Sequence, residues 1–312
     1  MSGDERDPVL CPIRVIVGPT AAGKSAIAMW LAARHEATIV SADSRQIYRR
    51  FDVGTAKPTA DERARVPHRA IDVVEPMQRY SAAAWADDAD RWIAESMREG
   101  RTPVVVGGTG LYVRALFEPF FEEPPLDASR RRTLEAVLGT LTLPELQRWA
   151  AALDPARAHL GRTQLLRAIE VALLSGRRLS DLHRELARPA RRAARYLVVD
   201  PGASLEERIA RRIDAMLEGG WPEEVERLRA DVPAEAPAWK STGYRQVRAL
   251  VEGRLSRADA QQAILIETRQ YAKRQRTWFR HQLPAAGVAR LDPTAPDWEA
   301  RVETWWNEDR ES

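Results

Sequence analysis

The segment Gly18-Pro-Thr-Ala-Ala-Gly-Lys-Ser25 has the residue types and spacing of a phosphate-binding loop. A β-branched run precedes it and a helical pattern follows it, which is the context that this motif requires. In such a loop, backbone N–H groups and the helix N-terminus attract phosphate oxygens, the Lys24 ammonium neutralises phosphate charge, and the Ser25 hydroxyl can hold Mg²⁺. The loop predicts a phosphate-bearing ligand without specifying which one, because backbone amides contact only the phosphate oxygens.

Two further polar residues follow apolar runs that are typical of strands. Asp43 comes just after the run 38–40, and Thr109 lies in Gly107-Gly-Thr-Gly110 after another run. Open α/β sheets bind ligands at the carboxyl ends of their strands, so both residues are expected near the loop. The Asp43 carboxylate could bind Mg²⁺, cap a helix or act as a general base, and the Thr109 segment could be a plain glycine-rich turn. The residues after Asp43 can hydrogen-bond to an amide or to the edge of a base: Ser44, Arg45, Gln46 and Tyr48.

Other candidate residues leave more than one interpretation open. Asp200 also follows an apolar run and could bind a metal ion, whereas the strand at 103–106 ends in Gly-Gly-Thr-Gly instead of the acid that routine ATP hydrolysis would need. The segment Gly54-Thr-Ala-Lys-Pro58 could bind an oxyanion or form a turn. His68 is interpreted as structural, because no Cys or Ser partner pattern accompanies it. No Cys/His spacing predicts a metal site.

Cations recur at helical spacing in the C-terminal half. Arg208 and Arg212 lie four residues apart and share a helical face, where they could pair with neighbouring acids such as Glu207 or bind an anion. Farther along, a cationic stripe has spacings of four, three and four, with Trp278 and Phe279 among its charges. Aromatic residues beside arginines suit single-stranded nucleic acid, although such a stripe could also face solvent and such rings could lie in the core. The stripe consists of Arg269, Lys273, Arg276 and Arg280.

The elements that must position these residues alternate between strand and helix patterns, which predicts an α/β fold with a parallel sheet of the P-loop NTPase type. Strands are expected at 13–17, 38–42, 103–106 and 195–199, and helices at 24–34, 82–98 after a Ser81 cap, 204–219 with a Ser204/Glu207 capping box, and 256–282. Between them, helices are expected at 129–138, 143–153, 164–174 and 180–186. We therefore predict a catalytic core over 13–119 and 190–312, with an inserted helical subdomain over 120–189.

Composition excludes several classes of protein. The 312 residues are 44% hydrophobic and 30% charged, which excludes a disordered chain. The single cysteine excludes an intramolecular disulfide, and no basic signal region or apolar run of about 20 residues predicts secretion or a membrane span, so we expect a cytoplasmic protein. Only four of the 48 basic residues are lysines, and the net charge is +3. The arginine excess suits phosphate and nucleic-acid binding, but genomic base composition can also produce it.

Several motifs, taken together and in order from about residue 13 to 282, resemble those of the tRNA dimethylallyltransferases, also called tRNA isopentenyltransferases. Those of the first half are the Gly18–Ser25 loop, Ser41-Ala-Asp-Ser-Arg-Gln-Ile-Tyr48, Gly54-Thr-Ala-Lys-Pro58, Tyr80-Ser-Ala-Ala83 and Gly107-Gly-Thr-Gly-Leu-Tyr112. Those of the second half are Arg167-Ala-Ile-Glu-Val171, Gly243-Tyr-Arg-Gln246, Thr268-Arg-Gln-Tyr-Ala-Lys-Arg-Gln275 and Thr277-Trp-Phe-Arg280. Such an ordered set is far more specific than one phosphate-binding loop.

The resemblance implies transfer of a dimethylallyl group from dimethylallyl diphosphate to the N6 amine of the adenosine 3′ to the tRNA anticodon, position 37. It implies that Asp43 is the general base, that Thr109 binds the base beside it, and that Mg²⁺ is a cofactor held by Ser25. The implied diphosphate-binding residues are Gly18, Pro19, Thr20, Ala21, Ala22, Gly23, Lys24, Ser25 and Arg212. The implied tRNA-binding residues are Asp43, Ser44, Arg45, Gln46, Thr109, Arg131, Gln164, Leu165, Leu166, Arg167, Ala168, Gly243, Tyr244, Arg245, Gln246, Lys273, Arg274, Gln275, Arg276, Thr277, Trp278, Phe279 and Arg280.

The sequence departs from the family pattern before Arg167. The family has Pro-Asn-Asp and then an arginine there, whereas this chain reads His159-Leu-Gly-Arg-Thr-Gln-Leu-Leu-Arg167, with Gln164 at the arginine position and Arg162 as a candidate replacement. Two other functions remain as alternatives. An ATP-dependent small-molecule kinase could use the same loop, and a non-catalytic RNA-binding protein could use a nucleotide as a switch. The partners expected are tRNA, through its anticodon stem-loop, and dimethylallyl diphosphate, bound by a monomer that does not interact with membranes.

Overall fold

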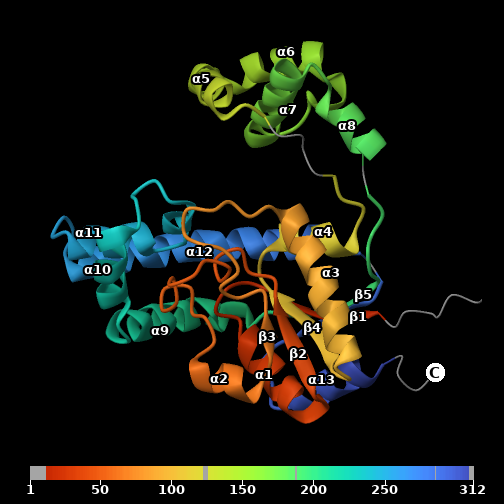
Figure 1. The fold of residues 1–312 in the computed structure, drawn as a ribbon, viewed down its shortest axis with the longest axis vertical. Coiled ribbons are helices and arrows are strands. Elements are labelled where there is room, and N and C mark those ends of the chain that lie inside the picture. The colour runs from red at the N-terminus through yellow and green to blue at the C-terminus, as the bar shows by residue number, and fades with distance from the viewer. Residues whose placement is uncertain (1–11, 122–125, 187, 285, 309–312) are drawn as a thin grey trace, which may run out of the picture. The chain divides into compact units, whose positions relative to one another are not determined.

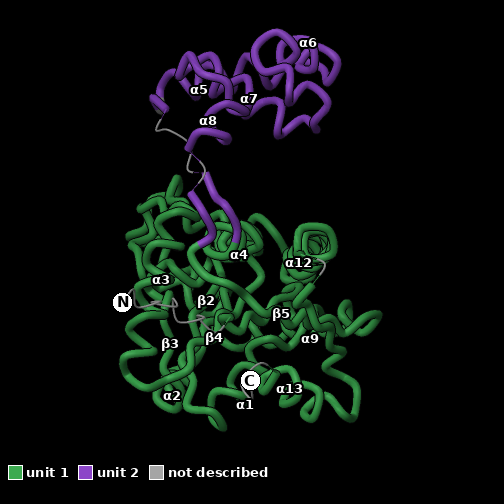
Figure 2. Tube along the Cα trace, turned by 90° about the vertical axis from the view of Figure 1, so that its right-hand side faces the viewer, with its two compact units in different colours: residues 1–117, 191–312 green, residues 118–190 purple. Residues whose placement is uncertain are grey.

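The computed structural model describes residues 12–308 except 122–125, 187 and 285. The chain divides into two compact units (Figure 2): residues 1–117 with 191–312 form unit 1, and residues 118–190 form unit 2. The sequence predicted an insert with bounds that lie within two residues of unit 2. In the part of the chain that the structure describes, no helix is both long and apolar enough to cross a membrane.

Unit 1 is built on a six-stranded sheet in which every neighbouring pair is parallel (Figure 1). The strands are β1 (Ile13–Val17), β2 (Ala37–Ser41), β3 (His68–Arg69), β4 (Thr102–Gly107), β5 (Ala194–Val199) and β6 (Val288–Leu291), and their order in the sheet is β3-β2-β4-β1-β5-β6. The expected α/β class is confirmed. Because β4 and β1 are the central pair of strands and run parallel, the segments that follow them meet at one edge of the sheet.

Nine α-helices of unit 1 lie within the described residues. They are α1 (Lys24–His35), α2 (Ala60–Arg65), α3 (Ala82–Arg98), α4 (Gly110–Phe117), α9 (Leu205–Glu218), α10 (Trp221–Asp231), α11 (Tyr244–Val251), α12 (Arg257–His281) and α13 (Trp298–Asn307). Every residue of β1 and β2 is buried, as strands covered on both faces require. Residues of α1 and α13 form one continuous apolar core with the sheet, including Ile27, Leu31, Val302 and Trp306.

The structure adds elements that the sequence patterns did not predict and corrects one helix cap. Strands β3 and β6 and helices α2 and α13 were not expected. The Ser204 capping box is wrong: Ser204 ends a short 3-10 turn, and its hydroxyl donates to the Pro201 carbonyl at 3.0 Å. The Ser81 cap is confirmed, since its hydroxyl accepts from the Ala84 N–H at 3.1 Å.

Every named element of unit 2 in the described residues is a helix, as the absence of strand patterns between 120 and 189 predicts. Its helices are α5 (Ala128–Gly139), α6 (Leu143–Leu153), α7 (Arg162–Ser175) and α8 (Leu179–Leu186). Buried residues of α5, α6 and α7 pack into one small core, among them Leu138, Leu146 and Leu165. Near its ends, Phe120 and Arg188 form an antiparallel bridge.

Candidate active site

The Gly18–Ser25 loop joins β1 to α1 at the carboxyl edge of the sheet. Inside the loop, Ala21 has a φ of 61°, a left-handed conformation that an alanine adopts only where its surroundings hold it. One such contact comes from α9, where the Arg208 Nε donates to the Ala21 carbonyl at 3.0 Å. The Lys24 ammonium donates to the Pro19 carbonyl at 2.7 Å and so lies across the loop.

A pocket beside this loop, here named the Lys24 pocket, gathers cations from two elements. Lys24 and Ser25 come from the start of α1, and Arg208, Arg211 and Arg212 come from α9. The pKa of Lys24 is lowered to about 8, mainly by burial and to a smaller extent by the charge of Arg212, while the charge of Asp43 opposes the shift. Burial also lowers the pKa of Arg212, again opposed by Asp43. A lowered pKa means that this site disfavours its own positive charges until an anion joins them.

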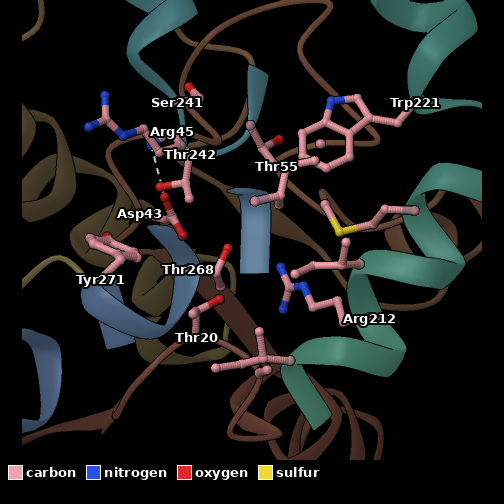
Figure 3. Close-up of a pocket in the computed structure, with 16 residues that line it drawn as sticks. Thr20, Asp43, Arg45, Thr55, Arg212, Trp221, Ser241, Thr242, Thr268 and Tyr271 are labelled. Atoms are coloured by element: carbon pink, nitrogen blue, oxygen red, sulfur yellow. Dashed lines mark hydrogen bonds between the residues drawn. The ribbon is translucent and has the colours of Figure 1, made fainter. Parts of the chain in front are cut away.

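A second pocket, here named the Asp43 pocket, adjoins the first, because Ala21 and Arg212 line both. Figure 3 shows Asp43, Thr20 and Thr268 turned toward one space, with Arg212 reaching toward it from α9. Apolar side chains complete the lining: Ile209, Ile213 and Met216 of α9, Trp221 of α10 and Ile264 of α12. The pocket therefore places a carboxylate, hydroxyls and an apolar wall around one space.

Asp43 lies in the turn that follows β2. One of its carboxylate oxygens accepts from the Arg45 N–H at 2.8 Å, which fixes the side chain in that turn. The next regular helix, α2, begins only at Ala60, so the helix-cap interpretation of Asp43 is wrong. The carboxylate lines the pocket and has electrostatic interactions with Lys24, Arg212 and Tyr271.

Thr109 links the segment after β4 to the segment after β2. Its hydroxyl oxygen accepts from the Ser44 N–H at 3.0 Å and lies 3.3 Å from the Ser44 hydroxyl. Its side chain also hydrogen-bonds with Tyr271 of α12. Burial raises the pKa of Tyr271 to about 12, and the nearby Asp43 charge raises it too, so the phenol stays neutral. The predicted proximity of Asp43, Thr109 and the Gly18–Ser25 loop is present in the structure.

Helix α12 turns a polar face toward this site that is not the face of the cationic stripe. Thr268 and Tyr271 line the Asp43 pocket, Gln275 hydrogen-bonds to the Gly18–Ser25 loop, and Trp278 lies against Gly110. In the cationic stripe, Arg276 forms a two-pronged ion pair with Asp200, and Arg269 lies 3.3 Å from Glu206. Lys273 and Arg280 are exposed, with no ion pair among the described residues. The stripe is therefore not four equivalent cations, and Asp200 is engaged by Arg276 instead of being open to a metal ion.

The structure corrects part of the predicted tRNA surface. Five residues of the predicted set have side chains buried inside their own unit, at most 6% exposed, and cannot offer those side chains to a nucleic acid: Leu165, Ala168, Tyr244, Gln275 and Phe279. In unit 2, Arg131 and Arg167 both form ion pairs with Glu170. Gly243 is buried as well, whereas the remaining predicted members keep some exposure.

The hydrogen bonds of three further candidates, Arg162, the 54–58 segment and His68, decide between the interpretations that the sequence left open. Arg162 is not free to replace the missing arginine, because its guanidinium donates to the carbonyls of Leu141 and Gly139 at 2.6 and 2.8 Å. The Lys57 ammonium is buried and donates to Tyr48, Asp52 and Asp72, so the 54–58 segment is a braced turn without a free cation for an oxyanion. His68 hydrogen-bonds to the Val66 carbonyl at 2.7 Å, as a structural histidine does.

Sequence reasoning missed several residues of the site. Thr55, Trp221 and Thr242 line the Asp43 pocket, and Arg211 lines the Lys24 pocket. A usable signal existed only for α12, where Thr268, Tyr271, Gln275 and Trp278 recur at spacings of three, four and three and so share one helical face. The charge pattern of the sequence indicated instead the opposite face of this helix, which carries the cationic stripe.

Comparison with known proteins identifies the family. The model of the IPP transferase family matches residues 46–282, and that of the isopentenyl transferase family matches residues 11–71. The chain belongs to the tRNA dimethylallyltransferase family. It is 41% identical over 280 residues to a tRNA dimethylallyltransferase of Deinococcus radiodurans, covering 88% of this chain and 91% of that protein. It is 43% identical over 305 residues to one of Burkholderia ambifaria, covering 93% and 92%.

Solved structures agree with this membership. A tRNA isopentenylpyrophosphate transferase from Bacillus halodurans superposes with a TM-score of 0.66 at 31% identity, covering 95% of this chain and 94% of that one. A eukaryotic dimethylallyltransferase acting on tRNA has a TM-score of 0.73 at 24% identity over 94% and 77% of the two chains, which supports the fold. As a tRNA dimethylallyltransferase family member, the chain is a tRNA-modifying prenyltransferase. The kinase alternative is not favoured.

Proposed function

We propose that the two adjoining pockets carry out one transfer: the dimethylallyl group leaves dimethylallyl diphosphate and joins the N6 amine of adenosine 37 of tRNA. The observation that carries this proposal is that Arg212 and Ala21 line both pockets. A diphosphate bound among the cations of the Lys24 pocket would therefore have its allylic carbon next to the carboxylate of the Asp43 pocket. A kinase would not need an apolar wall at that position.

The donor side would stabilise the leaving group. As the bond between the allylic C1 and the diphosphate oxygen breaks, its electron pair goes to the diphosphate, whose growing negative charge Lys24, Arg208 and Arg212 would stabilise. The main-chain N–H groups of the Gly18–Ser25 loop would add donors that are already in place. Because burial has lowered the pKa of Lys24, the arriving anion would restore the lysine's full charge.

The acceptor side would supply the nucleophile and remove its proton. The adenine amine is a poor nucleophile, so as its nitrogen bonds to C1 the carboxylate of Asp43 would accept one N6 proton. Thr109 and the neutral Tyr271 would hydrogen-bond near the base. The apolar residues Ile213, Met216 and Trp221 would enclose the dimethylallyl chain and exclude the water that could otherwise capture the allylic carbon. To reach this space the base must leave its stack.

Mg²⁺ is the cofactor that we propose for the donor side. The described residues contain no cluster of three or more His, Cys, Asp or Glu side chains that could hold a metal ion by themselves. The exposed Ser25 hydroxyl in the Lys24 pocket fits an ion that arrives with its substrate, because Mg²⁺ is commonly held by phosphate oxygens, water and one protein oxygen. When bound, it would neutralise charge on the leaving diphosphate.

The test is direct transfer. The full chain would be incubated with labelled dimethylallyl diphosphate, Mg²⁺ and unmodified tRNA, and the nucleosides of the digested tRNA would be separated. Label should enter N6-dimethylallyladenosine, and a tRNA with guanosine at position 37 should remain unlabelled. Label on any other nucleoside, or none at all, would contradict the proposal. Cytoplasmic location and a monomeric state remain predictions, which fractionation and light scattering would test.

A further inference from the structure

Gln275 lies in the middle of α12, and its side chain is only 6% exposed. Both ends of its amide are in use. The Thr20 main-chain N–H donates to Gln275 Oε1 at 2.8 Å, and Gln275 Nε2 donates to the Gly108 carbonyl at 2.8 Å. One buried side chain thus joins two loops that follow different strands of the sheet, at sequence separations of 255 and 167 residues.

The chemistry of these two partners requires an amide at this position. The Thr20 N–H can only donate and the Gly108 carbonyl can only accept, which also fixes which way the amide is turned. Glutamine offers one acceptor and two donors on one planar group. An ionised glutamate would keep the Thr20 bond but place a second carboxylate oxygen against a carbonyl oxygen, and methionine of similar length would lose both bonds.

The loop after β4 is shaped to let α12 come this close. A Cβ added at Gly108 would lie 2.2 Å from Gln275 Nε2, and one at Gly110 would lie 2.3 Å from the Trp278 ring. Both distances are far below van der Waals contact, so a side chain at 108 would displace the Gln275 amide and one at 110 would displace the Trp278 ring. Glycine at these two positions is explained by the approach of α12.

The two loops carry the two halves of the site. Thr20 lines the Asp43 pocket from the donor side, and Thr109, next to Gly108, holds the Ser44 N–H in the turn that carries Asp43. Gln275 contacts neither pocket itself, since it is absent from both linings. It sets the separation between the loop that would hold the diphosphate and the turn that would hold the general base.

We propose that Gln275 is a positioning residue that couples the donor loop to the acceptor turn, an inference that rests on the proposed function. In-line attack needs the amine nitrogen and the allylic carbon about 3 to 3.5 Å apart, and a misplacement of about 1 Å can cost about 10²-fold in rate. Loosening the two loops relative to each other should therefore slow the transfer step while each loop still binds its own substrate.

The experiment compares Gln275→Met with Gln270→Met, a control at an exposed glutamine of the same helix. Gln275→Met should lower kcat by about 10- to 100-fold and change the KM of either substrate by less than about threefold. The control should match the wild type. If Gln275→Met does not fold, Gln275→Glu, which keeps the Thr20 bond, is judged by the same criterion.

A double-mutant cycle with Thr109→Val separates positioning from simple structural support. If Gln275 acts through the Thr109 turn, the combined variant should be about as slow as the slower single variant, because both changes loosen the placement of the same turn, Gln275 through Gly108 and Thr109 through Ser44. A kcat within twofold of the wild type for folded Gln275→Met, or losses that multiply in the double variant, would overturn the inference alone. A wild-type chain that transfers no label to tRNA would overturn the proposed function, and this inference with it.

Discussion

The Lys24 pocket and the Asp43 pocket share a wall and differ in charge. The first is lined by Lys24, Arg208, Arg211 and Arg212, with no acid among its lining residues in the described chain. The second holds one carboxylate, Asp43, among hydroxyls and apolar side chains. Where they meet, Arg212 lines both pockets, and the charge of Asp43 opposes the lowering of the pKa of both Arg212 and Lys24.

This contrast shows how one fold can separate the two demands of a prenyl transfer. A leaving diphosphate needs positive charge fixed in advance, and the cost appears as the lowered pKa values of Lys24 and Arg212. A weakly nucleophilic amine needs a base to accept its proton, and the Asp43 carboxylate lies in the second pocket, close to Lys24 and Arg212. Substitutions in the Asp43 pocket should therefore lower turnover, whereas substitutions in the Lys24 pocket should lower the affinity for the donor.

The largest effect is expected from Asp43→Asn, which keeps the size of the side chain and the oxygen that accepts from the Arg45 N–H but removes the base. Turnover should fall by about 10² to 10⁴-fold, with the dissociation constants of dimethylallyl diphosphate and tRNA near those of the wild type. Single-turnover transfer and separate binding measurements check this. Asp61→Asn, at an exposed position in α2, is the matched control.

Added Mg²⁺ distinguishes the remaining roles of Asp43. If the carboxylate bound the metal ion, higher Mg²⁺ should restore part of the lost activity, whereas a missing base cannot be replaced in this way. Wild-type turnover in purified Asp43→Asn would remove the functional contrast between the two pockets altogether.

The second prediction concerns the other pocket. Lys24→Ala should weaken binding of dimethylallyl diphosphate by at least about tenfold, because a charge-assisted contact to phosphate is lost from a partly buried site, while tRNA affinity should change little. Calorimetric titration of each substrate checks this, with the exposed Lys240→Ala as the control. An equal loss of affinity for dimethylallyl diphosphate and for tRNA would mean that the two pockets do not bind the two substrates separately.

The pH dependence of donor binding sharpens the same contrast. Because the pKa of Lys24 is lowered to about 8 in the free protein, its charge is present below that pH and is lost above it. Affinity for dimethylallyl diphosphate should therefore fall as the pH rises above about 8, and binding there should take up a proton. Titrations in buffers of different ionisation enthalpy measure that uptake. Lys24→Arg stays charged and should flatten the profile, and an unchanged profile in this variant would assign the titration to another group.

Much of the fold and part of the site could be predicted from the sequence, for reasons visible in particular residues. Buried parallel strands give continuous β-branched runs, so β1, β2, β4 and β5 were predicted to within one residue, whereas β3 has two residues and β6 reads Val-Ala-Arg-Leu. The Gly18–Ser25 loop, Asp43 and Thr109 were predicted because each follows a strand.

The rest of the site depends on contacts between distant segments. Trp221 and Thr55 reach the Asp43 pocket only through the packing of α10 and the 51–57 turn, which no local pattern encodes. The family resemblance implied that Gln275 contacts tRNA, and only the folded chain reveals that its amide has two buried partners. Sequence patterns predict which face of a helix is distinctive, but not what that face packs against.

The smallest effect is expected from cations that lie outside both pockets. If Lys273 and Arg280 contact tRNA phosphates, replacing both with glutamine should weaken tRNA binding and flatten its salt dependence by roughly one unit of slope for each lost contact. Arg276→Gln is the matched comparison on the same helix: its guanidinium is held by Asp200, so its loss should lower the melting temperature and leave the slope unchanged. Filter binding over a range of salt concentrations distinguishes them. If only Arg276→Gln changed the salt slope, the ion pair between Arg276 and Asp200 would have to open when tRNA binds. The tRNA itself would then rearrange charged side chains that lie outside the two pockets.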